Sequence, residues 1–214
     1  MDNIVVTVAR GFGSGGKVIA SKVAEELGTK CYENRILTLA SRLSGYDEAE
    51  FVKVDERLRG NFITNRLRQL PVLQMPKPVL GRFQSDDKLF QYQCTIIREL
   101  AEKESCVIVG KCADYVLKDY PNVVSVYIEA PREYCRNRIM NRMMVSAPTA
   151  DKMIEETDQY RAEYYKYYSG GNYWTNPVNY DITLNPARLG EDQCVKLILE
   201  CAKYKKEQCG SPEK

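Results

Sequence analysis

The stretch RGFGSGGKV, residues 10–18, fits two motifs that belong to different folds. Gly11, Gly13 and Gly16 match the G-x-G-x-x-G spacing of a dinucleotide-binding turn. Gly11, Gly16 and Lys17 also match the G-x-x-x-x-G-K core of a phosphate-binding loop (P-loop), although valine stands where that motif has Ser or Thr. The first motif indicates a hydride-transfer enzyme and the second a phosphotransferase, so the rest of the chain must decide between them.

The segments around this stretch predict an α/β fold with a largely parallel sheet. NIVVTVA before it is a short buried strand, and VIASKVAEELG after it is a helix with one apolar stripe, as both motifs require. Two further strands are predicted at 106–110 and 123–130, and their continuous apolar character is typical of a sheet covered on both faces. A final strand is predicted at 179–185. Helices are predicted at 35–43, 88–103, 132–144, 149–168 and 189–206, with Pro148 breaking the chain and Thr149 as an N-cap.

Composition limits the possible functions. The chain has 214 residues, enough for one well-buried domain, and a net charge of +2, which gives no sign of a nucleic-acid polymer or a membrane as a partner. Its first residues lack a basic region followed by a long apolar core, and its apolar runs are too short to span a bilayer. We therefore expect a cytoplasmic protein, and the sequence leaves its oligomeric state open.

Histidine is absent and cysteine is frequent. The eight cysteines form no C-x-x-C pair, so scattered buried thiols are expected rather than a zinc site. Without histidine, every mechanism with an imidazole base is excluded, and Asp, Glu, Lys and Tyr remain for proton transfer. Phosphoryl transfer suits such a chain, because positioning and charge neutralisation do most of its catalytic work.

The context favours the P-loop. A dinucleotide site needs an acidic residue about 20 positions beyond the turn, at the end of a second strand. Glu33 has the right distance, but GTKCYE (28–33) is too short and polar for a central strand, and little chain remains for a substrate domain. A P-loop instead makes use of the arginines at 132–161, which would neutralise a transferring phosphoryl group. A solvated helix face is the alternative explanation for those arginines.

Several segments, taken in order, resemble the cytidylate kinase-like family of P-loop proteins. They are RGFGSGG after a strand, YENR at 32–35, VIVGKCADYVL at 107–117, DQYRAEYYKYY at 158–168 and NYDITLN at 179–185. The resemblance implies a P-loop NTPase fold with a five-stranded parallel sheet flanked by helices. It also implies one domain, with a core at 1–52, 86–140 and 176–205, an acceptor-binding insertion at 53–85 and a helical lid at 141–175.

The resemblance further implies transfer of the ATP γ-phosphoryl group to CMP or a similar nucleoside monophosphate, with Mg²⁺. Two alternatives remain open: a kinase of another small acceptor, and a nucleotide-binding sensor with weak catalysis. The implied donor site comprises Arg10, Gly11, Gly13, Ser14, Gly15, Gly16 and Lys17. In an ungapped alignment Gly16 takes the place of the family's P-loop lysine and Lys17 that of its Ser or Thr. Shifting the alignment by one residue restores G-K but leaves Val18 at the hydroxyl position, so metal binding is the function most in doubt.

The remaining implied roles fall on charged residues outside the loop. Lys111 stands where the family has an acceptor-binding Arg, and Asp114 is a partner for it or a helix cap. Glu33 and Arg35 stand where the family has an acidic residue and an arginine that binds the acceptor phosphate. An ordinary place on the solvent-exposed surface explains both nearly as well. The catalytic set implied by the loop and lid is Lys17, Arg138, Arg142, Asp158 and Arg161. The tyrosines at 160–168 are expected to pack a helix onto the core, with base stacking as the alternative.

Overall fold

The structure, a computed structural model, describes residues 3–33, 36, 39 and 87–210. The candidate acceptor residue Arg35, most of the helix predicted at 35–43 and the insertion at 53–85 lie outside these residues. The described residues therefore belong to the predicted core and to the segment predicted as the lid.

A five-stranded sheet forms the centre of the molecule, with the strand order β2-β3-β1-β4-β5 and every neighbouring pair parallel. Its strands are β1 (Val5–Arg10), β2 (Lys30–Tyr32), β3 (Cys106–Val109), β4 (Val123–Ile128) and β5 (Ile182–Leu184). The polar segment 28–33 is therefore a strand after all, but it is a three-residue strand at the edge of the sheet. An edge position tolerates its exposed Lys30, which a central strand would not.

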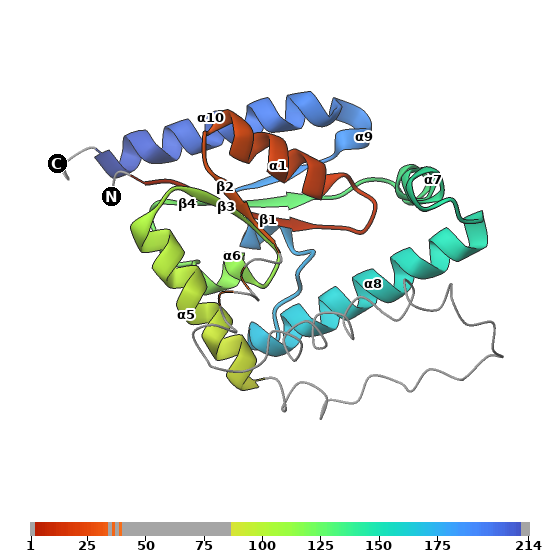
Figure 1. Ribbon diagram of the computed structural model, residues 1–214, viewed down its shortest axis with the longest axis horizontal. Helices are drawn as coiled ribbons and strands as arrows, with labels where there is room; N and C mark the ends of the chain where they lie inside the picture. Colours follow the sequence, from red (N-terminus) through yellow and green to blue (C-terminus); the bar gives the residue numbers. More distant parts are fainter. Residues whose placement is uncertain (1–2, 34–35, 37–38, 40–86, 211–214) are drawn as a thin grey trace.

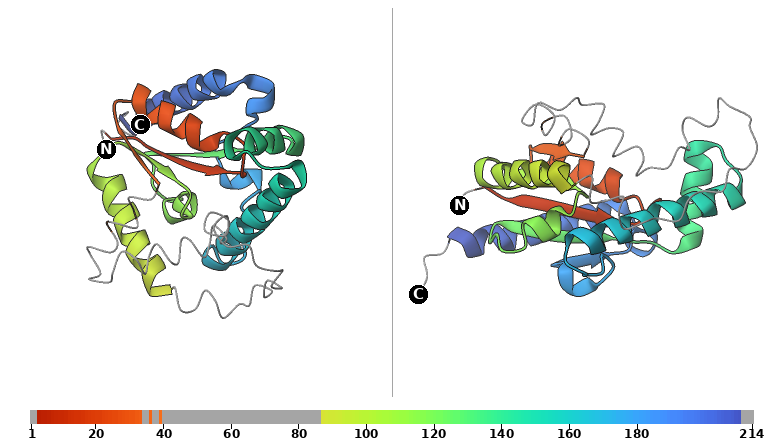
Figure 2. Two further views of the ribbon diagram at one scale, coloured as in Figure 1. Left: turned by 45° about the vertical axis from the view of Figure 1, so that its right-hand side comes forward. Right: turned by 90° about the horizontal axis from the view of Figure 1, so that it is seen from below.

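Helices cover both faces of this sheet (Figure 1). They are α1 (Gly16–Glu26), α5 (Asp87–Lys103), α6 (Ala113–Val116), α7 (Arg132–Met143), α8 (Ala147–Tyr168), α9 (Pro186–Leu189) and α10 (Glu191–Gly210), with a short 3₁₀ turn η2 (Pro177–Asn179). α1 and α10 lie on one face, and α5, α6 and α8 lie on the other (Figures 1 and 2). The predicted α/β fold with a parallel sheet between helices is confirmed.

The alternation of side chains along each strand builds one apolar core on either face. Val6 and Val8 of β1 face α1 and α10, and they pack with Ile19, Val23 and Ile198 from those helices. Val5 and Ala9 of the same strand face the other way, toward clusters that include α5, α6 and the aromatic side chains of α8. Both faces are apolar because both are covered, which explains the continuous hydrophobic runs in the strands.

Helix α8 begins earlier than expected. Its N-cap is Ser146, and Pro148 lies within its first turn rather than between two segments. Thr149 is therefore inside the helix, where its hydroxyl lies 2.9 Å from that of Ser146. Proline is tolerated there because the first N–H groups of a helix have no intrahelical acceptor. The prediction of a break at Pro148 with Thr149 as N-cap was wrong.

Helix α10 continues to Gly210, beyond the end of the helix predicted at 189–206. Cys94, Cys106, Cys112, Cys135 and Cys194 are buried thiols, and burial raises the pKa of Cys106 to about 12. Within residues 3–33 and 87–210, no helix combines the length and the apolar character needed to cross a bilayer.

Candidate phosphate-binding site

The glycine-rich loop lies at the carboxyl end of the central strand β1 and leads directly into α1. Gly13 and Gly15 have φ angles of 89° and 91°, a left-handed conformation that favours glycine. Gly15 is the N-cap of α1, and no acidic residue stands in the first turn of that helix. The helix itself therefore supplies no negative charge at its N-terminus, whose partial positive charge favours an anion.

The hydrogen bonds of the loop leave two of its N–H groups for a ligand. Among the described residues, the backbone N–H groups of Gly13 and Gly15 have no hydrogen-bond acceptor. The hydroxyl of Ser14 is fully buried, donates to the carbonyl of Gly11 at 2.9 Å and accepts from the N–H of Gly16 at 3.4 Å. Ser14 thus holds the loop in shape, and the free N–H groups form the concave anion site typical of such loops.

On the side of β2, one carboxylate binds two cations. Oε2 of Glu33 forms an ion pair with Nζ of Lys17, and Oε1 lies 3.4 Å from Nη2 of Arg10. The Lys17 side chain remains 53% exposed, whereas those of Arg10 and Glu33 are each 17% exposed. The structure therefore brings together three of the predicted site residues, at the carboxyl edge of the sheet.

The end of β3 approaches the same group of charges. A Cβ at Gly110 would lie 2.4 Å from Nη1 of Arg10, so only glycine leaves room for that guanidinium. Gly110, Lys111 and Cys112 have φ angles of 73°, 61° and 53°, a left-handed run that turns the chain sharply into α6. Lys111, the candidate acceptor residue, thus follows directly on the glycine that Arg10 covers.

On the side of α7, only one of the predicted arginines reaches the loop. Nη2 of Arg138 forms an ion pair with Oε1 of Glu191 at 2.7 Å, and both groups lie close to Gly15. Arg142 is exposed in the last turn of α7. Arg132 and Arg136, also on α7, pair with Asp151 of α8 and join the two helices. Arg138 is therefore the arginine placed to meet a phosphate at Gly15.

On the side of α8, Asp158 and Arg161 bind the backbone of the loop. Oδ1 and Oδ2 of Asp158 accept from the N–H of Phe12 at 2.9 and 3.2 Å. Nη1 of Arg161 donates to Oδ1 of Asp158 and to the carbonyl of Arg10, each at 3.1 Å. Burial is the largest influence on Asp158 and raises the pKa of its carboxyl to about 6, although Arg161 opposes the shift.

Asp114 lies deeper than a substrate-binding residue would. It is 6% exposed, and Oδ2 accepts a hydrogen bond of 2.7 Å from the hydroxyl of Tyr165. Burial raises the pKa of the Asp114 carboxyl to about 6, although this hydrogen bond lowers it. The structure therefore does not bring Asp114 together with the charged groups around the loop.

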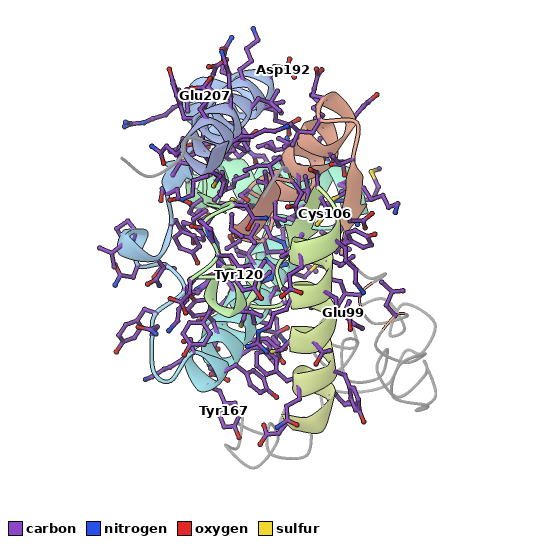
Figure 3. All side chains as sticks on the ribbon, turned by 90° about the vertical axis from the view of Figure 1, so that its left-hand side faces the viewer. Glu99, Cys106, Tyr120, Tyr167, Asp192 and Glu207 are labelled. Atoms are coloured by element: carbon purple, nitrogen blue, oxygen red, sulfur yellow. The ribbon has the colours of Figure 1, made fainter. Side chains whose placement is uncertain are left out.

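The tyrosines of α8 pack as predicted. Tyr165 is buried, and the ring of Tyr168 stacks on Phe90 of α5 with centroids 3.8 Å apart. Tyr164 meets the same phenylalanine edge-on. Tyr167, at the end of α8, donates to Asp87 in the first turn of α5, as the neighbouring ends of these helices in Figure 3 indicate. The aromatic run attaches α8 to α5 and to the sheet.

Two carboxylates near the loop were missed from the sequence. Glu129 follows β4 and accepts from the hydroxyl of Tyr127 at 2.7 Å, and a Cβ at Gly11 would collide with its carboxylate. Glu191 begins α10 and pairs with Arg138. Glu129 could have been found, because a polar residue directly after a buried parallel strand lies at the edge where ligands bind. Glu191 gave no local signal, since an acidic residue in a first helical turn is ordinary.

Mg²⁺ is the metal that the P-loop resemblance implies, and the donor groups fit it only in part. The one hydroxyl of the loop, on Ser14, faces inward, and Val18 supplies none. Among residues 3–33 and 87–210, no three His, Cys, Asp or Glu side chains are grouped closely enough to hold a metal ion. Mg²⁺ is usually bound by substrate phosphates, waters and one or two carboxylates. These residues fit that mode and not a dedicated protein site.

A parallel sheet with a glycine-rich loop between its central strand and the next helix defines a P-loop protein of the small-molecule kinase fold. Its sequence assigns it more narrowly. Residues 5–188 match the cytidylate kinase-like family, and the chain belongs to that family. Both the family and the fold are those of kinases, which are phosphotransferases.

Solved structures agree with this fold. An uncharacterized protein from Eubacterium ventriosum ATCC 27560 is similar at 25% identity, with 94% of this chain and 99% of that chain covered and a TM-score of 0.67. A gluconokinase from Sinorhizobium meliloti 1021 is similar at 14% identity, with 97% of each chain covered and a TM-score of 0.51. TT1252 from Thermus thermophilus has 14% identity, covers 95% of this chain and 98% of its own, and has a TM-score of 0.51. No curated protein sequence gives a significant match.

Proposed function

We propose that this protein transfers the γ-phosphoryl group of ATP to a small acceptor, with a nucleoside monophosphate of the CMP type as the first candidate. The observation that carries the proposal is the loop at Gly13–Gly16, where unoccupied N–H groups, a helix N-terminus and two cationic side chains converge. This combination binds phosphate oxygens.

In the proposed reaction an acceptor oxygen forms a bond to the γ-phosphorus, and the bond from that phosphorus to the β-γ bridging oxygen breaks. ADP leaves with that oxygen. The loop N–H groups hold the donor phosphates, with Lys17 and Arg138 neutralising the charge that moves during transfer. The nucleotide would bind together with Mg²⁺, which would neutralise part of the phosphate charge. The exposure of Lys17 leaves its ammonium group free to change partner from Glu33 to a phosphate.

The acceptor is proposed to bind at the ends of β2 and β3. Glu33 follows β2 and Lys111 follows β3, so both belong to the edge of the sheet beyond the loop. Glu33 is the better candidate than Asp114 for orienting the acceptor oxygen, because it lies beside Lys17 whereas Asp114 is buried against Tyr165. Arg35, which lies outside the described residues, stays a proposed ligand of the acceptor phosphate.

The direct test is product formation. Purified protein is incubated with Mg-ATP and CMP, dCMP, UMP or AMP, and nucleoside diphosphates are separated by ion-exchange chromatography. A second panel contains small polyols and hydroxy acids, with product detected by ³¹P nuclear magnetic resonance. Phosphorylated product in the first panel supports the nucleotide kinase. Product only in the second panel identifies another acceptor on the same fold, and no product in either contradicts the proposed enzyme.

A catalytically weak nucleotide-binding sensor is the second candidate, and two observations favour it. Lys17 is paired with Glu33, and the loop has no outward hydroxyl that would act as a metal ligand. This candidate predicts binding of ATP without turnover. Calorimetric titration with ATP, alongside the product assay, separates the two candidates.

A further inference from the structure

Two residues of α8 hold the peptide units on both sides of Gly11. Asp158 accepts from the N–H of Phe12, which follows this glycine, and Arg161 donates to the carbonyl of Arg10, which precedes it. The same guanidinium also donates to Asp158. The two side chains therefore form one connected group, which we term the α8 clamp, on the first turn of the phosphate loop.

The contacts around Phe12 strengthen this attachment. Its ring lies 5.6 Å from the guanidinium carbon of Arg161. The ring also packs against the apolar cluster between α7 and α8, which includes Ile139 and Met153. Helix α8 thus holds the backbone of Phe12, and α7 and α8 together hold its side chain. The clamp acts on a loop more than 140 residues away in sequence, as the separation of 146 residues between Phe12 and Asp158 shows.

The direction of these hydrogen bonds distinguishes the clamp from a substrate-binding group. The side-chain carboxylate of Asp158 is engaged by two donors, and its side chain is only 25% exposed. The side chain of Arg161 is 21% exposed, and Nη1 is shared between Asp158 and a backbone carbonyl. Both groups are therefore directed at the loop backbone.

We propose that Asp158 and Arg161 are positioning residues that fix the backbone of residues 10–12, and through it the phosphate loop, rather than groups that contact the transferred phosphoryl group. The catalytic part of this inference rests on the proposed kinase function. Its structural part, the attachment of the loop to α8, is independent of any activity.

Charges around Asp158 make the clamp sensitive to pH. Arg161 lies on the same helix as Asp158 and carries the opposite charge. Glu129, directly after β4, faces Asp158 and carries the same negative charge. Tyr127 of β4 and Cys135 of α7 also face it, and both remain neutral at physiological pH because burial raises the pKa of each. Since the pKa of Asp158 is about 6, its carboxylate is protonated as the pH falls below 6. Protonation removes the charge that strengthens the bond from the Phe12 N–H, but it also removes the larger cost of holding that charge away from water.

The test measures that N–H directly. Amide hydrogen exchange of Phe12, expressed as a protection factor so that intrinsic pH effects cancel, is followed by nuclear magnetic resonance in wild type, Asp158→Asn and Arg161→Lys. ADP is titrated calorimetrically into the same proteins, and the KM of the acceptor is measured wherever the product assay gives turnover. Glu156→Gln is the matched control, because Glu156 pairs with Lys152 on the same helix without touching the loop.

At pH 7.5 we expect Asp158→Asn to lower the protection factor of Phe12 about tenfold and to weaken ADP binding, because a charge-assisted hydrogen bond is lost. Arg161→Lys, which keeps the charge and loses the fork geometry, should show a smaller loss in both measurements. Because the folded protein binds the proton of Asp158 more tightly than the unfolded chain does, the wild-type protection factor should rise as the pH falls from 7 to 5, whereas that of Asp158→Asn should stay flat. Glu156→Gln should match wild type throughout.

Unchanged Phe12 protection in both clamp variants would overturn the inference. So would a rise in the KM of the acceptor with unchanged protection and ADP affinity, since that pattern belongs to residues that bind the acceptor. Arg161→Lys keeps the test decisive even where Asp158→Asn fails to fold. If wild type neither binds ADP nor forms product, the proposed function fails while the exchange data still decide whether the clamp exists.

Discussion

The loop has two flanks with opposite character. On the α8 flank, Asp158 and Arg161 are about three-quarters buried, and their hydrogen bonds end on backbone atoms. On the β2 flank, Lys17 is half exposed, and Glu33 binds it side chain to side chain. Each flank contains one acidic and one basic side chain that pair with each other. Only the pair on the β2 flank can exchange a partner without disturbing the loop backbone.

This difference separates positioning from ligand binding. A partly buried ion pair that also satisfies backbone groups is strongly destabilised when one partner is removed, because the other partner is left without compensation. In the other pair Glu33 is 17% exposed but the cation, Lys17, is 53% exposed, so water weakens its hold and a phosphate can compete for it. Charged residues that look equivalent in the sequence therefore have different expected roles.

The largest expected effect is on the β2 flank, for Lys17→Ala. We expect kcat/KM for phosphoryl transfer to fall about 100-fold or more, because a cation facing the transferring group is lost. Thermal unfolding should change little. Lys30→Ala is the control, since Lys30 lies on β2 and forms its ion pair with Glu104, away from the loop. Equal activity losses in the two variants would remove the distinction between the flanks.

A pH titration of stability tests the burial of Asp114, which accepts a hydrogen bond from Tyr165 of α8. The pKa of its carboxyl is about 6 in the folded protein, whereas the ordinary value for an aspartate carboxyl is 3.8. The folded protein therefore binds this proton more tightly than the unfolded chain does. Stability from this group is therefore fully present below pH 4 and lost as the pH rises through 6. Because Asp158 has the same direction of shift, both groups contribute to the loss in wild type.

Asp114→Asn should remove its share of that dependence, about 2 kcal/mol between pH 4 and 7. Urea unfolding at half-unit pH intervals, with the wild-type and variant curves subtracted, measures it. A difference that is independent of pH would mean that Asp114 is ionised with an ordinary pKa.

Removing the cation of the α8 clamp should have a smaller effect on stability. Arg161→Ala leaves the carboxylate of Asp158 without its guanidinium partner, and we expect a loss of about 1.5 kcal/mol in the free energy of unfolding at pH 7.5. The loss should shrink at pH 5, where Asp158 is protonated. Chemical denaturation at both pH values tests this, with Lys152→Ala on the same helix as the surface control. A loss that stays the same at pH 5 would contradict the role of the Asp158 charge.

The smallest expected effect is a gain. Glu33→Gln removes the carboxylate that binds Lys17, and ADP should then bind up to about fivefold more tightly, as expected for an ion pair with a half-exposed cation that is worth about 1 kcal/mol. Turnover should fall at the same time if Glu33 orients the acceptor. Glu104→Gln, which removes the partner of Lys30 at the other end of β2, should leave ADP binding unchanged. An unchanged affinity in Glu33→Gln would show that this carboxylate does not compete with phosphate.

The sequence predicted the parts of the fold that depend on local pattern. Continuous apolar runs identified β1, β3 and β4, and glycine spacing placed the loop between β1 and α1. β2 was underestimated, because a three-residue edge strand is stabilised by its pairing with β3 rather than by its own composition. Pro148 was misplaced since proline breaks a helix interior and yet suits a first turn.

The candidate site was predicted less fully, for a physical reason. Spacing and resemblance identified residues that are charged, but the partner of each charge is set by tertiary packing. Arg138 faces Gly15 whereas Arg136 faces Asp151, although both lie on α7 only two positions apart. Two positions on a helix differ by about 200° in direction, so one arginine meets the loop and the other meets α8.

Helix α8 also has a mechanical consequence. Its 22 residues form a rod about 33 Å long, attached near its start to α7 through Asp151, in its middle to the loop through Asp158, and at its end to α5 through Tyr168. A stiff body fixed at three points moves as a unit. Helix α8 therefore connects the first turn of α5 to the backbone of the glycine-rich loop, two regions that are far apart in the sequence.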